Sequence, residues 1–346
     1  MKQRLAINGY GRIGRSVFRA ICERGLRDRL PLVAVNEPAD LDTVVYLTKY
    51  DSTHGRFPGH VARDGDRLLV DGDAIRVSHS EELAALNWPD VDVVLECSGT
   101  FDTRALAEKH LQAGAGRVLF SQPARPDVDA TIVHGINNGE LRAEHRIISA
   151  ASCTTNCVVP VLDTLHRGLG IEEGVITTIH SAMNDQPVLD SYHHTNLRKT
   201  RSAIQAMIPV DTLLARGIDR VMPALAGRIE AQAMRVPIQN VSVIDLSVTV
   251  SRDTDWRQVN ALLAAAADGP LAGILGYTEE PLASCDFNHD PHSGIVDASQ
   301  TRVGGKRLVK VLVWFDNEWG YANRMVDVLL DWQAKIALAG GQGTEP

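Results

Sequence analysis

Cys153 is the residue whose surroundings most clearly predict chemistry. It lies in the run Ser152-Cys153-Thr154-Thr155-Asn156-Cys157, which follows an apolar segment at 146–148 and leads into a predicted helix at 157–167. The start of a helix offers unpaired N–H groups and the positive end of the helix dipole, both of which lower a thiol pKa. A thiolate is a strong nucleophile for an aldehyde carbon. We therefore predict a nucleophile at Cys153 and a buried structural thiol at Cys157.

A nucleophilic cysteine needs a nearby base. His180 is the preferred candidate because it ends a strand-like run at 175–179, where a side chain can face a cleft. The sequence alone does not bring His180 close to Cys153. The alternatives among the twelve histidines are His166, His193 and His194.

A glycine-rich turn near the N-terminus indicates a dinucleotide site. The pattern Gly9-x-Gly11-x-x-Gly14 follows a predicted strand at 4–8 and begins a predicted helix, whose N-terminal N–H groups can bind phosphates. A second strand at 32–36 is followed by Glu37, whose carboxylate can accept hydrogen bonds from both hydroxyls of the adenosine ribose. A negative charge there repels a 2′-phosphate, and Pro38 offers no donor. The pattern therefore favours NAD over NADP.

Two further segments have plainer interpretations. His289-Asp290-Pro291-His292, close to Asp286, has histidines that could bind a metal, but Pro291 would break any helix that aligned them. We predict a loop with a structural role or a subunit contact, and no metal. The basic stretch at 196–201 is typical of a solvated face.

The elements that must position these residues predict an α/β protein with two domains. Apolar runs at 4–8, 32–36, 91–95, 117–120 and 130–133, with helices between them, predict a Rossmann-type doubly wound parallel sheet. Two Asp-Gly pairs bracket Arg67–Val70 and predict a hairpin. Longer strand-like runs at 174–179, 230–236, 241–250 and 308–315 predict an α+β domain with a mostly antiparallel sheet. We place the NAD-binding domain at 1–152, completed by the C-terminal helix (317–346), and the catalytic domain at 153–316.

Composition excludes several classes of protein. The 346 residues are 44% hydrophobic and 23% charged, which argues against disorder, and a net charge of −8 predicts neither a nucleic-acid nor a membrane partner. We find no signal-peptide pattern and no apolar run near the ~20 residues of a membrane-spanning helix. The five cysteines are irregularly spaced, without a C-x-x-C pair. We expect a soluble, cytoplasmic protein.

Three segments resemble the glyceraldehyde-3-phosphate dehydrogenase superfamily. They are Asn8–Arg15 (NGYGRIGR), Ser152–Cys157 (SCTTNC) and Trp314–Tyr321 (WFDNEWGY), in the family's order and spacing over nearly the whole chain. Segments 49–57, 180–186 and 286–293 are most similar to the branch that oxidises erythrose 4-phosphate. The resemblance implies NAD as cofactor, a small phosphorylated aldehyde as substrate, a homotetramer and a place in pyridoxal phosphate biosynthesis.

The resemblance also implies a role for each matching residue. Cys153 would be the nucleophile, and His180 would activate it and shuttle the proton. Residues that would bind NAD are Gly9, Gly11, Arg12, Ile13, Gly14, Glu37, Ser121 and Asn317, the last through the nicotinamide carboxamide. Residues that would bind substrate or phosphate oxygens are Ser152, Thr154, Lys199, Thr212, Leu213 and Arg235. Lys199 replaces the arginine usual in the family, and so loses the bidentate fork.

Two departures from the family pattern concern the second half of the reaction. Met183 stands where the family typically has a threonine, and Leu213 where it has a glycine. Both changes weaken the anion sites that a phosphorylating reaction uses. We therefore expect water to remove the acyl group from Cys153, giving 4-phosphoerythronate from erythrose 4-phosphate. The alternatives are a phosphorylating, glycolytic glyceraldehyde-3-phosphate dehydrogenase and, from another class, a non-catalytic NAD-binding regulatory protein.

Overall fold

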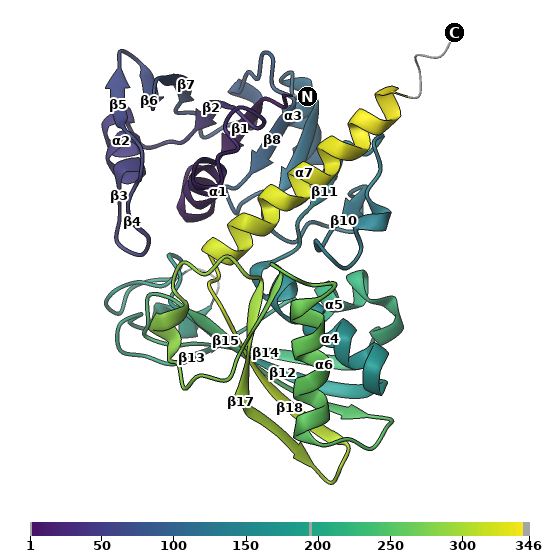
Figure 1. The fold of residues 1–346 in the computed structure, drawn as a ribbon. Helices are drawn as coiled ribbons and strands as arrows, with labels where there is room; N and C mark the ends of the chain where they lie inside the picture. Colours follow the sequence, from purple (N-terminus) through teal and green to yellow (C-terminus); the bar gives the residue numbers. More distant parts are fainter. Residues whose placement is uncertain (1, 194–195, 342–346) are drawn as a thin grey trace. The chain divides into compact units, whose positions relative to one another are not determined.

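A computed structural model describes residues 2–193 and 196–341 of the chain, which forms two compact units (Figure 1). The first unit comprises Met1–Ala151 and Ala322–Pro346, and the second comprises Ser152–Tyr321. His194, one of the alternative bases, lies outside the described residues, as do the outermost ends of the predicted NAD-binding domain, 1 and 342–346.

The first unit is built on a nine-stranded sheet. Its strands are β1 (Leu5–Asn8), β2 (Leu32–Asn36), β5 (Val61–Asp64), β6 (Arg67–Val70), β7 (Asp73–Ser78), β8 (Val93–Glu96), β9 (Arg117–Phe120), β10 (Ala130–Thr131) and β11 (Ile147–Ser149). They follow the order β10-β11-β9-β8-β1-β2-β7-β6-β5, parallel from β10 to β7 and antiparallel from β7 to β5. The antiparallel edge confirms the predicted hairpin around Arg67–Val70.

The strand order reverses at β1, so the crevice at the carboxyl ends of β1 and β8 is the switch point of a doubly wound sheet. Every residue of β1 and β8 is buried, as expected for strands covered on both faces. The helices of this unit are α1 (Arg12–Glu23), α2 (Leu41–Lys49), α3 (Arg104–Gln112) and, from Ala322 onward, α7 (Trp319–Gly341). A small hairpin joins β3 (Tyr50–Asp51) to β4 (Gly55–Arg56).

The end of α7 is held on the first unit by buried and charged contacts. Trp332 is fully buried and donates its indole N–H to the carbonyl of Arg142, at 3.2 Å. The Arg24 guanidinium on α1 pairs with Asp327, at 2.7 Å. These contacts explain why the C-terminal residues belong to the same unit as the N-terminal half.

The second unit is built on a seven-stranded sheet. Its strands are β12 (Ile171–His180), β13 (Ile208–Val210), β14 (Ile229–Arg235), β15 (Ser242–Val250), β16 (Leu275–Thr278), β17 (Gly294–Gly304) and β18 (Leu308–Phe315). The order is β13-β14-β12-β15-β18-β17-β16; β12/β14 and β16/β17 are parallel and the other pairs antiparallel. The α/β fold class with a mostly antiparallel second sheet is thereby confirmed.

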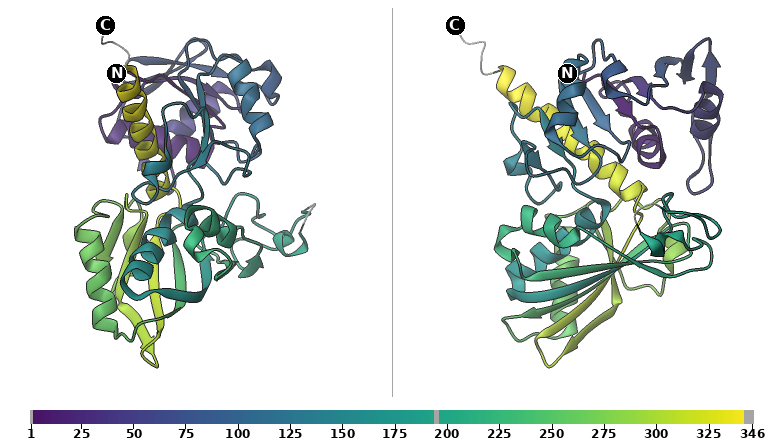
Figure 2. Two further views of the ribbon diagram at one scale, coloured as in Figure 1. Left: turned by 90° about the vertical axis from the view of Figure 1, so that its right-hand side faces the viewer. Right: turned by 180° about the vertical axis from the view of Figure 1, so that it is seen from behind.

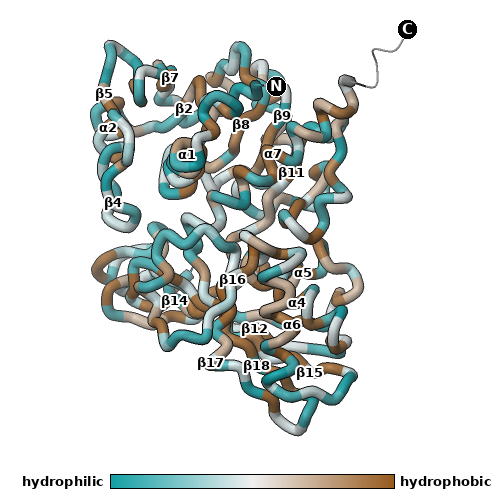
Figure 3. The backbone as a smooth tube through the Cα atoms, in the orientation of Figure 1, coloured by the Kyte–Doolittle hydropathy of each residue, from teal (hydrophilic) through white to brown (hydrophobic). Residues whose placement is uncertain are grey.

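Three α-helices accompany this sheet within the described residues: α4 (Cys153–Leu169), α5 (Leu214–Val221) and α6 (Trp256–Asp268). Helices α4 and α6 lie side by side along one face of the sheet (Figure 2). Short 3₁₀ helices are η1 (Leu83–Ala85), η2 (Asn138–Glu140), η3 (Leu197–Thr200), η4 (Pro223–Leu225) and η5 (Ser284–Phe287). The hydrophobic residues of each unit gather on the inner strands and helices, whereas the connecting loops are mostly hydrophilic (Figure 3).

The predicted element boundaries need several corrections. The strand predicted at 130–133 is reduced to β10, Ala130–Thr131, and the strand predicted at 91–95 is β8, Val93–Glu96. Helix α4 begins four residues before the predicted 157, because Ser152 caps it. Strand β17 was not predicted, since its polar second half lacks an apolar pattern. Among the described residues, no helix is both long and apolar enough to cross a membrane.

Candidate active site

Helix α4 begins at Cys153. Ser152 has an extended backbone, and its hydroxyl accepts the N–H of Thr155 at 3.1 Å, which is the standard arrangement of a helix N-cap. The first residue of the helix is therefore Cys153, and the nearby backbone N–H groups of Cys153 and Thr154 act to lower the pKa of its thiol. Cys157, one turn later, is fully buried, as predicted for a structural thiol.

His180 ends β12 and lies beside Cys153. The distance from His180 Nε2 to Cys153 Sγ is 3.9 Å. The other ring nitrogen, Nδ1, is 2.9 Å from the carbonyl oxygen of Ser181, which can only accept a hydrogen bond. Nδ1 therefore donates and Nε2 is the basic nitrogen that faces the thiol. The alternative His166 instead accepts the N–H of Ile171.

The other described alternative, His193, accepts the N–H of Asn196 through Nδ1, at 3.2 Å. The corresponding bond from Ile171 to His166 measures 3.1 Å. Both rings thus have local structural hydrogen bonds at the ends of their own segments. Of the three described candidates, His180 is the one placed beside the thiol. It is the last residue of β12, and this strand ends near the start of α4.

The thiol and the imidazole are both held in their neutral forms. Burial raises the pKa of Cys153 to about 12, although the backbone N–H groups of Thr154 and Cys153 oppose this and the carboxylate of Glu318 adds to it. Burial also lowers the pKa of His180, partly offset by its bond to Ser181. This differs from the prediction of a lowered thiol pKa: desolvation of the site outweighs the helix N-terminus. A thiol held neutral in this way would need a base before it could act as a nucleophile, and His180 Nε2 is placed to take the proton.

Asn317 lies between β18 and α7, and its amide has a defined orientation. Its Oδ1 accepts the hydroxyl of Ser181 at 3.0 Å and that of Ser242 at 2.8 Å. The Nδ2 group therefore points away from both serines. The preceding Asp316 is buried and accepts the N–H of Trp319 at 2.8 Å, which fixes the turn that presents Asn317.

The His289–His292 loop supports this turn. The N–H of His289 donates to Asp316 at 2.8 Å, and the His289 ring stacks on Trp319 with 3.7 Å between centroids. His292 pairs with Asp290 at 2.7 Å. Within the described ranges, no group of three or more His, Cys, Asp or Glu side chains could hold a metal ion. The loop thus has the structural role that was one of the two predicted.

The hydroxyl residues predicted to bind substrate lie in two places. Ser152 and Thr154 are together at the start of α4, with 3.0 Å between their hydroxyl oxygens. Thr212 accepts the N–H of Leu214 at 3.2 Å, just before α5. Leu213 is the N-cap residue of α5, and its side chain is 61% exposed. The side chain of Met183 is 47% exposed. Neither of these last two side chains offers a donor.

The two cations predicted to bind phosphate both contact one carboxylate. Arg235, at the end of β14, is buried and holds Asp185 in a bidentate pair, with Nη1–Oδ1 at 2.5 Å and Nη2–Oδ2 at 3.2 Å. Lys199 Nζ lies 2.7 Å from Asp185 Oδ2. The two cations hold the pKa of Asp185 below its ordinary value, although burial opposes them. Sequence reasoning missed Asp185, because three distant segments meet there.

In the first unit, the glycines at the end of β1 form a cradle that fits a dinucleotide. Gly9 has a φ of +87°, and a Cβ there would lie 2.5 Å from the backbone of Ser98. Gly11 is the N-cap of α1, where no side chain makes a cap hydrogen bond and a Cβ would meet no atom within 4 Å. There is thus open space beside Gly11, where the first turn of α1 with Ile13 and Gly14 begins, and the N–H groups of a helix start suit a pyrophosphate.

The other predicted cofactor residues follow the carboxyl ends of the same sheet. Glu37 follows β2, and its Oε2 accepts the N–H of Tyr10 in the glycine turn at 2.8 Å. Ser121 follows β9, and its N–H donates to the carbonyl of Glu96 at 3.0 Å. The Arg12 guanidinium pairs with Asp51, so this side chain is already held by a carboxylate of the chain. The structure thus gathers these residues at one edge of the sheet.

Comparison with known families agrees with both units. A family model described as glyceraldehyde 3-phosphate dehydrogenase, NAD binding domain, matches residues 3–104. A second, described as glyceraldehyde 3-phosphate dehydrogenase, C-terminal domain, matches residues 152–317. The first match makes NAD the cofactor, and the two together cover most of the chain in the family's own order. The chain therefore belongs to the glyceraldehyde-3-phosphate dehydrogenase superfamily of NAD-dependent oxidoreductases.

Proposed function

We propose that this chain is a D-erythrose-4-phosphate dehydrogenase. It oxidises D-erythrose 4-phosphate with NAD, through a thioester on Cys153, and water releases 4-phosphoerythronate. The observation that supports this most is the pairing of Arg235 and Lys199 with Asp185. Two cations that could bind an incoming phosphate ion are both already paired with one carboxylate of the chain, which lowers their combined charge from +2 to +1.

A phosphorylating dehydrogenase must hold two phosphoryl groups at once, that of the aldehyde and the attacking phosphate ion. The hydroxyls of Ser152, Thr154 and Thr212 supply donors for one of them. A second site would depend on Arg235 and Lys199, and on a donor at position 183, where the chain has methionine. An inorganic phosphate ion would have to compete with Asp185, whereas water needs no anion site.

The first chemical step is addition of the thiol to the aldehyde. As Cys153 Sγ bonds to C1, its proton passes to His180 Nε2, the unprotonated nitrogen that faces it. The new alkoxide is stabilised by the backbone N–H of Cys153 and by the protonated imidazole. Ser181 keeps the ring in place through its carbonyl oxygen.

The thioester forms when the alkoxide electrons restore the C=O bond and hydride leaves C1. NAD, when bound, would supply the acceptor for this hydride, and we propose that Asn317 Nδ2 would hold its carboxamide. His180 releases its proton to solvent and becomes a base again. It then takes a proton from water as the hydroxide adds to the thioester carbon. The C–S bond breaks, the carboxylic acid leaves, and His180 returns its proton to Cys153 Sγ.

The test is a comparison of aldehydes and acyl acceptors. Purified protein is assayed for NADH formation with D-erythrose 4-phosphate and with D-glyceraldehyde 3-phosphate, each with and without inorganic phosphate. We expect erythrose 4-phosphate to be preferred and phosphate to be dispensable. Preferred turnover of glyceraldehyde 3-phosphate with an absolute need for phosphate would establish the glycolytic alternative instead. No turnover of either aldehyde would favour the regulatory protein.

The variant Asp185→Asn sharpens this test. It frees Arg235 and Lys199 for an external anion, so we expect phosphate to raise the rate of acyl release about tenfold more than in the parent. Asp190→Asn is the matched control on the same segment, since Asp190 pairs with Arg201, at 3.0 Å. An unchanged phosphate response in Asp185→Asn would remove the main support for hydrolysis.

The same proposal includes a homotetramer that acts in pyridoxal phosphate biosynthesis. Exposed apolar side chains between β12 and α5 support self-association, because Leu189, Tyr192 and Leu197 are 71%, 85% and 85% exposed. Light scattering on a gel-filtration column measures the mass of the assembly. A monomer across the micromolar range would contradict this part of the proposal.

A further inference from the structure

A buried polar network lies at the carboxyl edge of the first sheet, centred on Glu96. Glu96 ends β8 and is completely buried. Its Oε2 accepts Asn8 Nδ2 at 2.7 Å and His110 Nε2 at 2.8 Å, while its Oε1 accepts the N–H of Ser98 at 2.8 Å. Both oxygens of one carboxylate thus accept from three different segments.

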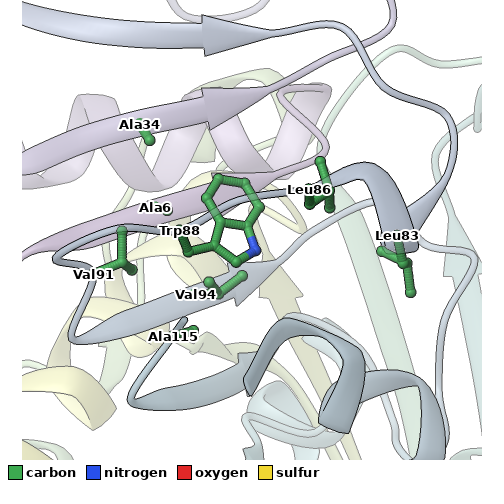
Figure 4. Close-up of a cluster of buried hydrophobic side chains, with 8 residues drawn as sticks. All are labelled: Ala6, Ala34, Leu83, Leu86, Trp88, Val91, Val94 and Ala115. Carbon is green, nitrogen blue, oxygen red and sulfur yellow. The ribbon is translucent and has the colours of Figure 1, made fainter. Parts of the chain in front are cut away.

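The proton of His110 is fixed by a tryptophan. Trp88 Nε1 lies 3.0 Å from His110 Nδ1, and an indole nitrogen can only donate. His110 Nδ1 is therefore the acceptor, and its proton is on Nε2, directed at Glu96. Trp88 is itself held in a buried cluster with Ala6, Leu86 and Val94 (Figure 4). The histidine has no freedom to exchange its donor and acceptor nitrogens.

The network continues across the neighbouring strands. Asn8, at the end of β1, accepts Asn36 Nδ2 at 2.8 Å through its Oδ1. Asn36, at the end of β2, accepts the hydroxyl of Ser78 at 2.9 Å and the N–H of Ser80 at 3.0 Å. These side chains join the carboxyl ends of β8, β1, β2 and β7. In a doubly wound sheet, this is the edge where the loops bind a dinucleotide.

The segments that the network holds are those next to the predicted cofactor residues. Ser98 packs on Gly9 of the glycine turn, where even a Cβ would not fit. Glu37 directly follows Asn36, and the N–H of Ser121 donates to the carbonyl of Glu96. We propose that Glu96 is a positioning residue for NAD, which sets the spacing of the loops after β1 and β8 without touching the cofactor. This inference concerns NAD binding and holds whichever aldehyde is the substrate.

The test is Glu96→Gln, with NAD binding measured by fluorescence titration or calorimetry without any aldehyde. An amide can accept at one position only, so its NH₂ group faces either Ser98 N–H or the donors of His110 and Asn8. His110 cannot adapt, because Trp88 occupies its Nδ1. We expect the Kd for NAD to rise about tenfold or more, with kcat at saturating NAD within about twofold of the parent.

Asp92→Asn is the matched control. Asp92 lies just before the amino end of the same strand and accepts the N–H of Arg4, at 2.6 Å. The same acid-to-amide change there should leave the Kd for NAD unchanged. A general loss of sheet stability would affect both variants, whereas a positioning role affects Glu96→Gln alone. Unfolding midpoints of both proteins are measured beside the titrations.

Two further variants complete the test. The double variant Glu96→Gln with Trp88→Phe removes the indole donor from His110 Nδ1. The proton of His110 can then move to Nδ1, and Nε2 can accept a hydrogen bond from the new amide. NAD affinity should therefore recover by about threefold or more relative to Glu96→Gln alone. Asn8→Ala removes one donor and is measured if Glu96→Gln does not fold; it should raise the Kd about fivefold at unchanged kcat. A folded Glu96→Gln, or in its place a folded Asn8→Ala, with the parent Kd for NAD overturns the proposal. So does a fall in kcat at unchanged Kd.

Discussion

Helices α1 and α4 begin in opposite ways. The N-cap of α1 is Gly11, with no side chain to satisfy the N–H groups of the first turn and open space in front of them. The N-cap of α4 is Ser152, whose hydroxyl accepts the N–H of Thr155, while the N–H groups of Cys153 and Thr154 act on the Cys153 thiol and oppose the rise of its pKa. One helix start is left for a ligand, and the other is used by the chain itself.

The difference shows what a helix N-terminus does in two environments. At α1 no side chain of the N-cap uses the donors, and an external phosphate can bring its negative charge to them. At α4 the same kind of donors act on a buried thiol, and burial still raises the pKa of Cys153 to about 12. Partial charges at a helix end do not outweigh desolvation there, which is why we propose that His180 acts as the base that removes the proton.

The largest expected effect comes from removing the thiol. Cys153→Ser should lower kcat by about 10⁴-fold or more, because a buried hydroxyl is a far weaker nucleophile. NAD binding, measured by titration, should stay within about twofold. Cys157→Ala is the control on the same helix and should retain turnover. Appreciable activity in Cys153→Ser would mean that the start of α4 is not the reactive site.

Removing the base comes next. His180→Asn keeps a polar side chain but no general base, so we expect kcat to fall by about 10²–10³-fold. Alkylation of Cys153 by iodoacetamide near pH 7, followed by mass spectrometry, should slow in parallel, because the thiol loses its proton acceptor. His166→Asn is the control, since His166 only caps the end of α4. Equal alkylation rates in the parent and His180→Asn would show that α4 alone activates the thiol.

A third prediction addresses the open helix start. Gly11 has an ordinary φ of −76° and room for a methyl group, so Gly11→Ala should fold with unchanged or slightly higher stability. The methyl group would lie where a pyrophosphate approaches, and we expect the Kd for NAD to rise about tenfold. Gly9→Ala, at a φ of +87° and against Ser98, should instead destabilise the fold. Equal NAD binding in Gly11→Ala would mean that the opening at α1 is not used.

The smallest effects concern stability against pH. Burial lowers the pKa of His180 from 6.5, so its neutral form stabilises the fold above about pH 6.5, and this contribution is lost as pH falls further. Burial raises the pKa of Cys153 from 9.0, so its contribution is present below about pH 9 and is lost as pH rises toward 12. Each group contributes at most about 1.4 kcal/mol per pH unit to the unfolding free energy.

Urea unfolding between pH 5 and 10 measures these slopes. His180→Asn should flatten the curve on the acid side, and Cys153→Ser on the alkaline side. If both variants gave the same dependence of unfolding free energy on pH as the parent, neither group would be held neutral by burial. The starts of α4 and α1 would then differ in their hydrogen bonding alone.

The sequence predicted the features that depend on neighbouring residues. The glycine turn before α1 was predicted, because the φ angles of such a turn involve residues within one turn of each other. The cap that Ser152 gives α4 is equally local but was not predicted, and the helix was placed four residues late. The strands around them were placed to within a few residues, and their order along the chain predicted a doubly wound sheet. Strand β17 was missed because its second half is polar and mostly exposed, and so has no alternating hydrophobic pattern.

Other features follow only from tertiary structure, because they join segments far apart in the chain. Asp185 meets Lys199 and Arg235 from three segments, and Glu96 meets Asn8 and His110 across a sheet. No local pattern specifies such contacts, since they depend on which strands become neighbours. The sequence by itself indicated the glycine turn before α1 and a helix start near Cys153, although it placed the first residue of α4 four positions late. Tertiary burial decided that Cys153 is held as a neutral thiol, because desolvation depends on everything packed around an atom and not on its neighbours in the chain.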